Sequence, residues 1–514
     1  MNYPLSIQDL FYQGTKEAMP SYGSELPQNF TYDPGATSSL FELGYFPQQG
    51  FPLLATTLVF FLIFCLILLF FRQKRKSSDF TIFIFLGSLF FVFFGPLSLP
   101  SFFKINTTLG LAKLIGALLL IYSLIEVFFR KKFDFFYTRS FLPLSFYILS
   151  LLVSVFFITN LNFFLTDLSL VITGVLFFYL GFYFLKNWRN LHTLLVSLAW
   201  LTLFPALLVL FIFIFNDQGK EVIKVLYPRY ENFVFLHDLS RGRILSVIDL
   251  EFFTPCIFYL FLSQKESFKR FWFLIVFFLS SMAIFLTNYR YRFLTFIVAI
   301  ATFIFFLKDK SKKIFFKFFT IAFTAIFGFY LLVMAFLGGQ NIVNRFLLQN
   351  YENDVDSLRR RGVMMSQAWN LFLKFPVFGV GVGNYKDNVD VVYERFGGRV
   401  YEPFYKILQN VYAYPHNWFL LVLAENGIVG FFILLWLLYV FLKSDIFLYK
   451  RLKGKQFLMF LTISATSWLY VFANLFTPLH NSLPMVIFFW TFRGMIERIY
   501  YNETNGSKIK AETP

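Results

Sequence analysis

The sequence predicts an all-α protein, a polytopic bundle of about 12–13 transmembrane helices with one large external loop that contains short amphipathic helices. Of its 514 residues, 58% are hydrophobic and only 15% are charged, whereas a soluble domain carries about 25% charged residues. The mean hydropathy is +0.63, and many of the 81 phenylalanines lie in unbroken apolar runs. Because lipid is the only solvent that tolerates so much apolar surface, these runs are expected to cross a membrane.

A helix needs about 20 apolar residues to cross the hydrocarbon core of a bilayer, and the chain offers about thirteen such runs. The expected spans cover residues 52–71, 80–98, 109–129, 141–158, 166–185, 191–215, 244–263, 271–288, 293–307, 314–337, 417–442, 456–474 and 482–496. The chain therefore divides into five parts. These are an external tail (1–50), a bundle of about ten spans (51–337), a large external loop (338–416), the remaining spans (417–496) and a cytoplasmic tail (497–514).

Short basic clusters between the spans predict which side of the membrane each loop occupies. The clusters follow the odd-numbered spans, at residues 72–76, 130–132, 186–189, 265–270, 308–317 and 443–455, and the tail after the last span is basic as well. Because positively charged loops stay in the cytoplasm, the N-terminus is expected outside and the C-terminus inside. Membrane topology thus accounts for the formal net charge of +17, and no nucleic-acid partner is expected.

The large external loop, residues 338–416, contains a predicted amphipathic helix. Ser357 is a suitable N-cap residue, and Pro376 marks the end of the helix. The expected stripe along one face of this helix consists of Arg361, Met365, Ala368, Trp369 and Phe372. Such a stripe predicts a helix that lies along the membrane surface. Three glycines at alternate positions of residues 379–383 then predict a flexible turn.

Several arginines are expected on the external side, where the positive-inside rule disfavours them. They include Arg243 before the seventh span, Arg290 and Arg292 in a short connection at the membrane edge, and Arg361 in the large loop. A guanidinium binds phosphate through two parallel hydrogen bonds and stays charged at any relevant pH. Pairing with carboxylates or lipid head groups is the alternative interpretation. The position of Arg290 and Arg292 favours a ligand role.

The segment 414–418, Tyr-Pro-His-Asn-Trp, stands directly before an apolar span. Pro415 suits the first turn of a helix, where its missing N–H costs nothing. His416 would then lie at the positive end of the helix dipole, which lowers the pKa of an imidazole and keeps it neutral. A neutral imidazole accepts a proton, and the same helix start can hold a phosphate. The alternative role is an interfacial hydrogen bond. His237 and His480 are the other external histidines, in weaker contexts.

Buried carboxylates offer further candidates, since such groups are costly in a membrane and are usually paired or functional. Glu425 follows His416 by about nine residues, which is about 180° around an ideal helix, so we expect it to pair within the bundle. Asp249 is the second candidate for a proton acceptor. Asp354 and Asp356 resemble part of a metal-binding motif, but they stand among arginines, so neither a metal nor a cofactor is expected.

Three features of the chain resemble the O-antigen ligase and polymerase family of bacterial envelope glycan assembly. They are Arg290 after a Thr-Asn-Tyr step, the run from Arg361 through Trp369 and Pro376 to the glycines and Asn384-Tyr385, and Pro415-His416-Asn417 followed by Glu425-x-Gly427. The resemblance covers about residues 240–435. Where the family commonly has Ser before its arginine, this chain has Tyr289, so Arg292 is an alternative equivalent of Arg290.

The resemblance implies transfer of a glycan from a polyprenyl (undecaprenyl) diphosphate to an acceptor hydroxyl, on the outer face of the bacterial cytoplasmic membrane. It implies a metal-independent, inverting reaction in which His416 is the base and the large loop acts as a lid. The residues expected to hold the donor diphosphate are Arg243, Arg290 or Arg292, and Arg361, with Asn417, Glu425 and Asp249 in support. Arginines can neutralise the charge that the leaving diphosphate gains.

The acceptor and the class of protein leave alternatives open. A ligase would use lipid A core as acceptor, a polymerase would use another lipid-linked glycan, and a protein acceptor is a third option. Membrane lipids surround the chain in every case. A transporter or flippase of lipid-linked oligosaccharides is the alternative from another class. It would place charged residues along a central cavity, whereas here they gather at one face.

Overall fold

The structure of the chain is a computed structural model that describes part of its length. The described residues are 138–185, 188–203, 205–207, 209–211, 249–287, 290–307, 312–321, 324, 328, 351–388, 414–477 and 479–505. All of them belong to one compact unit, Ile63–Pro514. The first three predicted spans, the N-terminal tail and Arg243 lie outside the described residues.

Every regular element in the described part of the chain is a helix. In chain order they are α6 (Phe141–Val153), η3 (Ser154–Phe157), α7 (Leu161–Phe184), α8 (Trp188–Leu201), η5 (Leu250–Phe253), α11 (Thr254–Ser263), α12 (Ser267–Leu286), α13 (Arg290–Phe306), α16 (Tyr351–Lys374), η6 (Lys386–Asn388), α19 (Trp418–Arg451), α20 (Gly454–Ala473), η7 (Leu479–Asn481) and α21 (Leu483–Thr504). The predicted spans from residue 141 onward all overlap helical residues, and the span 314–337 does so at residues 314–321, outside the elements named above.

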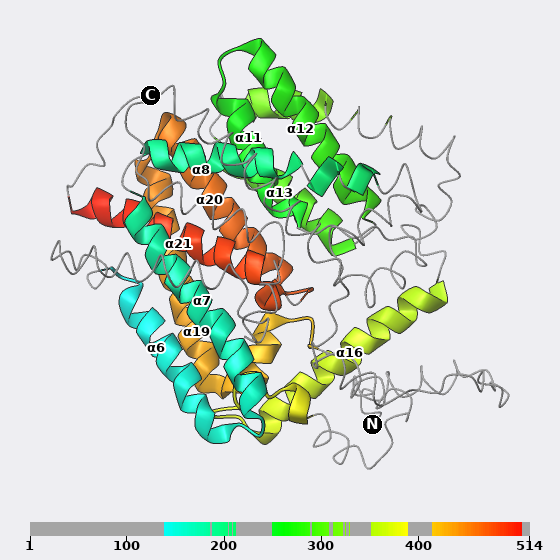
Figure 1. Cartoon of the computed structure of the whole chain (residues 1–514), viewed down its shortest axis with the longest axis vertical. Coiled ribbons are helices and arrows are strands. Elements are labelled where there is room, and N and C mark those ends of the chain that lie inside the picture. The colour runs from blue at the N-terminus through cyan, green and yellow to red at the C-terminus, as the bar shows by residue number, and fades with distance from the viewer. Residues whose placement is uncertain are drawn as a thin grey trace, which may run out of the picture. The chain divides into compact units, whose positions relative to one another are not determined.

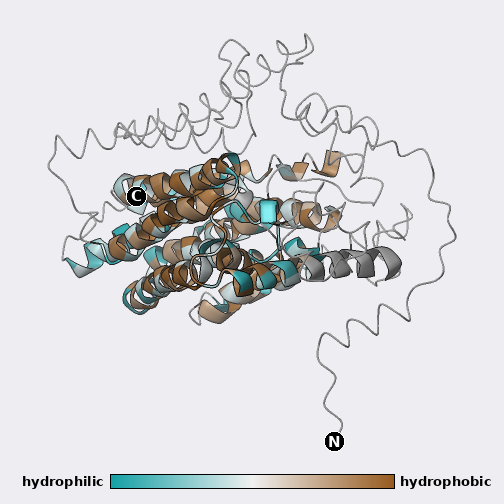
Figure 2. Cartoon of the chain, turned by 90° about the horizontal axis from the view of Figure 1, so that it is seen from below, coloured by the Kyte–Doolittle hydropathy of each residue, from teal (hydrophilic) through white to brown (hydrophobic). Residues whose placement is uncertain are grey.

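Five of the described helices are long and apolar enough to cross a membrane. They cover Leu161–Tyr183, Trp188–Phe211, Ser267–Leu286, Trp418–Arg451 and Gly454–Ala473, and two shorter apolar helices cover Phe141–Phe157 and Leu250–Ser263. Figure 2 shows apolar residues running along most of their length. The predicted class, a polytopic bundle of transmembrane helices, is therefore confirmed.

The helices α7 and α21 lie side by side because small residues allow their backbones to approach closely (Figure 1). A Cβ atom on Gly181 would overlap the carbonyl oxygen of Thr491, and one on Gly494 would overlap the carbonyl oxygen of Phe178. Close approach of this kind drives helix association in lipid, where burial of apolar surface contributes no net driving force. Together with α6 and α19, this pair forms the part of the bundle on which the candidate site is built.

One end of the bundle gathers loops that are far apart in sequence. The backbone N–H of Trp418 donates to the carbonyl of Asn474 (2.9 Å). The side-chain oxygen of Asn384 accepts from the backbone N–H groups of Thr159 (3.1 Å) and Asn160 (2.6 Å). The sequence predicts that all of these loops are external, and the packing is consistent with that grouping.

The opposite end of the same helices carries the basic residues. Arg451 at the end of α19 donates to Glu503 of α21 (2.7 Å), and the guanidinium of Arg139 lies 4.9 Å from the ring centre of Tyr500. The two ends therefore differ in charge as the positive-inside rule requires. The side of the membrane that each end faces stays a prediction.

Candidate active site

The amphipathic helix of the large loop is α16, and the face that it buries in the protein overlaps the predicted apolar stripe only at Ala368. The helix begins at Tyr351, ahead of Ser357, and ends at Lys374, just before Pro376 as predicted. Its buried apolar residues are Met364, Ala368 and Leu371, whereas Trp369 is 47% exposed. Of the predicted stripe, Ala368 is buried in the protein and Trp369 is exposed; the position of this helix along the membrane surface stays a prediction. Tertiary packing selects the face, because Ala368 and Leu371 join a cluster with Val380, Tyr385, Tyr414, Leu421 and Ala424.

The glycine turn after α16 is tightly packed against α19. The N–H groups of Val380 and Gly381 donate to the carbonyls of Ala424 (3.0 Å) and Glu425 (2.8 Å), and Ile428 donates back to Pro376 (2.8 Å). All three glycines of residues 379–383 have a positive φ. A Cβ atom on Gly379 would overlap the backbone of Glu425. The prediction of a flexible turn was therefore wrong.

A break inside α19 allows the glycine turn to form these hydrogen bonds with it. Gly427 has φ 62° and ψ −164°, so the helix is interrupted there, and a Cβ atom at this position would overlap the carbonyl of Val377. Only glycine adopts such a conformation while another backbone lies so close. Just before the break, the Glu425 side chain is 4% exposed and accepts from the Tyr385 N–H (3.3 Å). The glycine turn thus holds Glu425 in position.

His416 stands before the first turn of α19 rather than within it. Asn417 is the N-cap residue, and its side chain accepts from the N–H of Leu420 (3.1 Å). The prediction that Pro415 occupies the first helical turn was therefore wrong, because the cap that satisfies the free N–H groups is Asn417. His416 itself has a left-handed φ of 49°, which holds its ring outside the helix.

The surroundings of His416 keep its imidazole neutral. Burial lowers its pKa first, and the positive charge of Arg361 lowers it further, to about 4. The predicted direction is found, but the cause is burial and a cation rather than the helix dipole. Among the residues that the structure describes, none forms a hydrogen bond with its Nδ1. Arg361 on α16 and His416 before α19 are thus brought together from distant parts of the chain.

Residues on both sides of His416 are anchored to the bundle. The Tyr414 hydroxyl donates to Asp167 on α7 (3.2 Å), and the Tyr414 ring lies edge-on to His480 with ring centres 5.4 Å apart. On the other side, Trp418 is tied to α20 by the bond described above. The segment 414–418 therefore has little freedom to move away from α7 and η7.

The second group of predicted residues forms a buried ion-pair cluster. Arg292 is 6% exposed, its Nη2 lies 2.6 Å from Asp249 Oδ1 and its Nε lies 4.0 Å from Glu251 Oε1. The Tyr291 hydroxyl donates to the same Asp249 oxygen (3.0 Å). Arg290, at the first residue of α13, is exposed. The structure thus separates the two arginines that the sequence left as alternatives.

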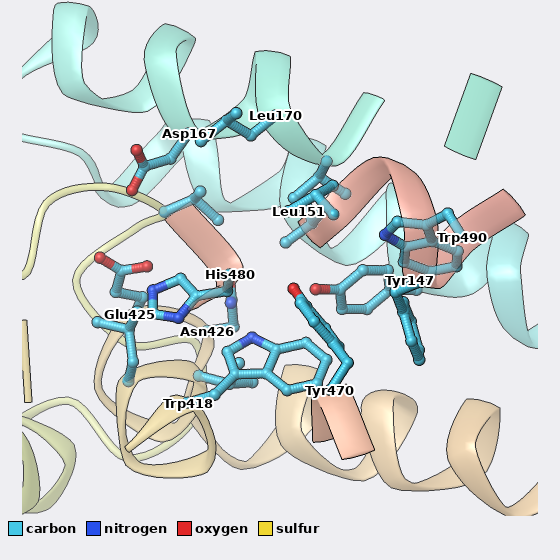
Figure 3. Close-up of a pocket in the computed structure, with 16 residues that line it drawn as sticks. Tyr147, Leu151, Asp167, Leu170, Trp418, Glu425, Asn426, Tyr470, His480 and Trp490 are labelled. Atoms are coloured by element: carbon cyan, nitrogen blue, oxygen red, sulfur yellow. The ribbon is translucent and has the colours of Figure 1, made fainter. Parts of the chain in front are cut away.

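A pocket lies beside the 414–418 segment, and sequence analysis did not find it. It encloses about 620 Å³, its open mouth included. Asp167, Glu425 and His480 gather at one end, and Tyr147, Tyr470 and Trp490 lie toward the other (Figure 3). Asp167 could have been singled out, since a carboxylate inside an apolar span is rarely accidental. No three His, Cys, Asp or Glu side chains within the described ranges are placed to hold a metal ion.

The fold and the site define a helical membrane protein in which a neutral histidine lies within the electrostatic influence of an arginine, where one set of loops converges. Residues 275–435 match the family model described as O-antigen ligase. The match, which covers less than half of the chain, supports its assignment to the O-antigen ligase and polymerase family. It includes α13, α16, the glycine turn, His416 and the start of α19. No curated protein matches the chain.

Proposed function

We propose that this protein transfers a glycan from a polyprenyl diphosphate to an acceptor hydroxyl at the outer face of the cytoplasmic membrane. The proposal rests above all on His416, a neutral imidazole beside Arg361 in a segment that both belongs to the family match and is anchored to the bundle. The coarser conclusion, a membrane protein of a glycan ligase and polymerase family, does not depend on this assignment.

In the proposed reaction His416 is the general base. The acceptor oxygen attacks the anomeric carbon from the face opposite the diphosphate, its proton passes to the imidazole, and the bond from that carbon to the diphosphate oxygen breaks. The polyprenyl diphosphate leaves with the bonding electrons, and the configuration at the anomeric carbon inverts. The reaction needs a positioned base and cations around the leaving group, and no metal is required for either role.

Binding of the donor also tunes this base. With a pKa of about 4 the imidazole is neutral at pH 7, but it is a weak base. A bound diphosphate places negative charge beside Arg361 and His416, and an opposite charge nearby favours the protonated form of an imidazole. The pKa of His416 is therefore expected to rise when the donor binds, so that the base becomes effective in the complex.

For the diphosphate we assign Arg361 and Arg290, with Arg243 in the same role by family resemblance. Arg292 is instead neutralised by Asp249 at 2.6 Å, so we assign it and Asp249 to support of the fold. Asn417, as the N-cap of α19, and Glu425, held by the glycine turn, position the backbone around His416.

A matched pair of variants tests this division between the two arginines. Arg290→Ala is expected to lower glycan transfer by about 10- to 1,000-fold, because leaving-group charge is less well neutralised, with little change in the unfolding temperature. Arg292→Ala is expected to lower the free energy of unfolding by about 3–5 kcal/mol, because Asp249 and Glu251 are left buried without their cation. Thermal unfolding and turnover are measured on the same preparations. The opposite pattern would assign the donor to Arg292.

The function itself is tested with purified protein in liposomes. A polyprenyl-diphosphate glycan is supplied with either lipid A core or excess donor, in the presence of EDTA. We expect a glycosylated acceptor together with released polyprenyl diphosphate, and the acceptor that is consumed distinguishes a ligase from a polymerase. Movement of the intact donor across the bilayer without product would instead indicate a transporter.

A further inference from the structure

We propose that the pocket beside the 414–418 segment binds a hydroxyl-rich sugar unit that carries no negative charge. This inference rests on the proposed function, because it names the part of the glycan substrate that this pocket recognises.

At one end of the pocket the polar groups include several hydrogen-bond acceptors. Asp167 and Glu425 bring carboxylates from α7 and α19, and a carboxylate can only accept. Asn426 also lines the pocket and is 6% exposed. Its Oδ1 has no hydrogen-bond partner among the described residues. Buried polar groups are almost always satisfied, so this amide indicates a partner with hydrogen-bond donors. Hydroxyl groups are such donors.

His480 adds a further acceptor, and its hydrogen bonds indicate which ring nitrogen accepts. The Nδ2 group of Asn474 donates to the Tyr470 carbonyl (2.9 Å), which identifies the Asn474 oxygen as the atom that faces His480 Nδ1 (3.3 Å). Nδ1 must therefore carry the proton in this contact, and in the neutral ring Nε2 is the acceptor. Figure 3 shows this ring at the same end of the pocket as Asp167 and Glu425.

The other end of the pocket is aromatic. Tyr147, Tyr470 and Trp490 are buried there, and Trp418 forms part of the wall (Figure 3). Aromatic rings offer flat apolar faces, with a polar group at the edge in Tyr and Trp. The two faces of a sugar ring carry C–H groups, whereas its hydroxyls project from the rim. An apolar wall beside a set of acceptors therefore fits a sugar, while two carboxylates repel phosphates and sugar acids.

The pocket lies close to the proposed base. Tyr414, two residues before His416, contacts both Asp167 and His480, and Trp418, two residues after it, lines the pocket. Five residues span at most about 14 Å between their first and last Cα atoms. A sugar in the pocket is thus within about one or two sugar units of His416. A glycan that reacts at His416 would therefore extend into the pocket.

Binding is tested without the donor, on the full-length protein in nanodiscs prepared free of glycoside detergents. The probes are methyl glycosides of neutral hexoses and N-acetylhexosamines, and methyl glycosides of the corresponding hexuronic acids, observed by saturation-transfer NMR. We expect at least one uncharged glycoside to bind at least tenfold more tightly than its uronic acid. Equal or tighter binding of the uronic acids would overturn the inference.

Isosteric variants locate the binding. Asp167→Asn removes one negative charge and keeps an oxygen that can accept from Tyr414. This variant is expected to weaken binding of the uncharged glycoside about fivefold. It is also expected to reduce the difference in affinity between that glycoside and its uronic acid. Glu425→Gln, which keeps an acceptor for the Tyr385 N–H, is expected to act similarly and serves if the first variant does not fold. Glu266→Gln is the control, since it removes one exposed charge outside the pocket.

The outcomes separate this inference from the proposed function. Glycoside binding that depends on Asp167 or Glu425, without product in the liposome assay, would retain the sugar pocket and refute the transferase. Product formation with affinities that change less than twofold in both pocket variants would retain the transferase and refute the pocket.

Discussion

Replacing His416 by alanine or asparagine is expected to abolish glycan transfer, with turnover reduced by at least about 10²–10⁴. The acceptor hydroxyl loses its proton acceptor in both variants, while the arginines that bind the donor remain. Asparagine tolerates a left-handed φ better than alanine, so His416→Asn is expected to unfold at a temperature closer to that of the original protein. Turnover in liposomes and thermal unfolding are measured together.

The control for this prediction is a histidine in a different contact. The Nδ1 atom of His192 lies 2.6 Å from the Tyr259 hydroxyl, and His192→Gln keeps a group that can form this bond. This variant is expected to retain turnover. Retention of full activity in His416→Asn would remove His416 from the mechanism, whatever happens in the control.

The same histidine predicts a specific dependence on pH. A general base works in its neutral form, so activity is lost as the pH falls through its pKa. For kcat/KM, which reports the free enzyme, the acid limb is expected near pH 4, because the pKa of free His416 is about 4. For kcat the limb is expected at higher pH, because the bound diphosphate raises this pKa. If activity falls at the same pH in the kcat and kcat/KM profiles, donor binding does not raise the pKa of His416.

The substitution with the largest expected effect on folding is Gly427→Ala. The combination of φ 62° and ψ −164° is essentially restricted to glycine and costs another residue about 1–3 kcal/mol, and here the new Cβ atom also overlaps the Val377 carbonyl. The bonds between residues 376–381 and 424–428 must then lengthen or break, which displaces Glu425. We expect a loss of several kcal/mol in the free energy of unfolding, seen as a marked fall in the unfolding temperature and in turnover.

Gly454→Ala separates the two causes of that effect. Gly454 has a similar φ of 58°, but no atom lies within 4 Å of a Cβ built on it. In this variant the free energy of unfolding is expected to fall only by the conformational cost, about 1–2 kcal/mol. Its activity is expected to be retained. If the two variants unfold at the same temperature, the hydrogen bonds between residues 376–381 and 424–428 contribute nothing to stability.

Part of the site could be predicted from local sequence because local chemistry decides it. Pro376 stops α16 wherever that helix lies, and a histidine next to an apolar run is near a membrane edge. The start of α19 was placed too early because Pro415 and Asn417 both suit a helix start, and the left-handed φ of His416 selects the later one. No local pattern distinguishes these choices.

Other features depend on partners far away in the chain. The buried face of α16 follows from its packing on Tyr385 and Leu421, and the rigid glycine turn follows from its bonds to α19. Arg290 and Arg292 are equivalent in sequence, yet Arg292 is buried beside Asp249 and Glu251, whereas Arg290 is exposed. The pocket on Asp167 and Glu425 likewise joins helices that sequence alone does not bring together.

Composition by itself determined that this is a helical membrane protein and where most of its described helices lie. The physical reason is that lipid cannot satisfy backbone N–H and C=O groups, so each long apolar run has to form a helix whatever its neighbours are. Tertiary structure alone decided which cations are neutralised, which face of α16 is buried and where a pocket remains. Those outcomes depend on the packing of particular helices, which lipid as a solvent leaves undetermined.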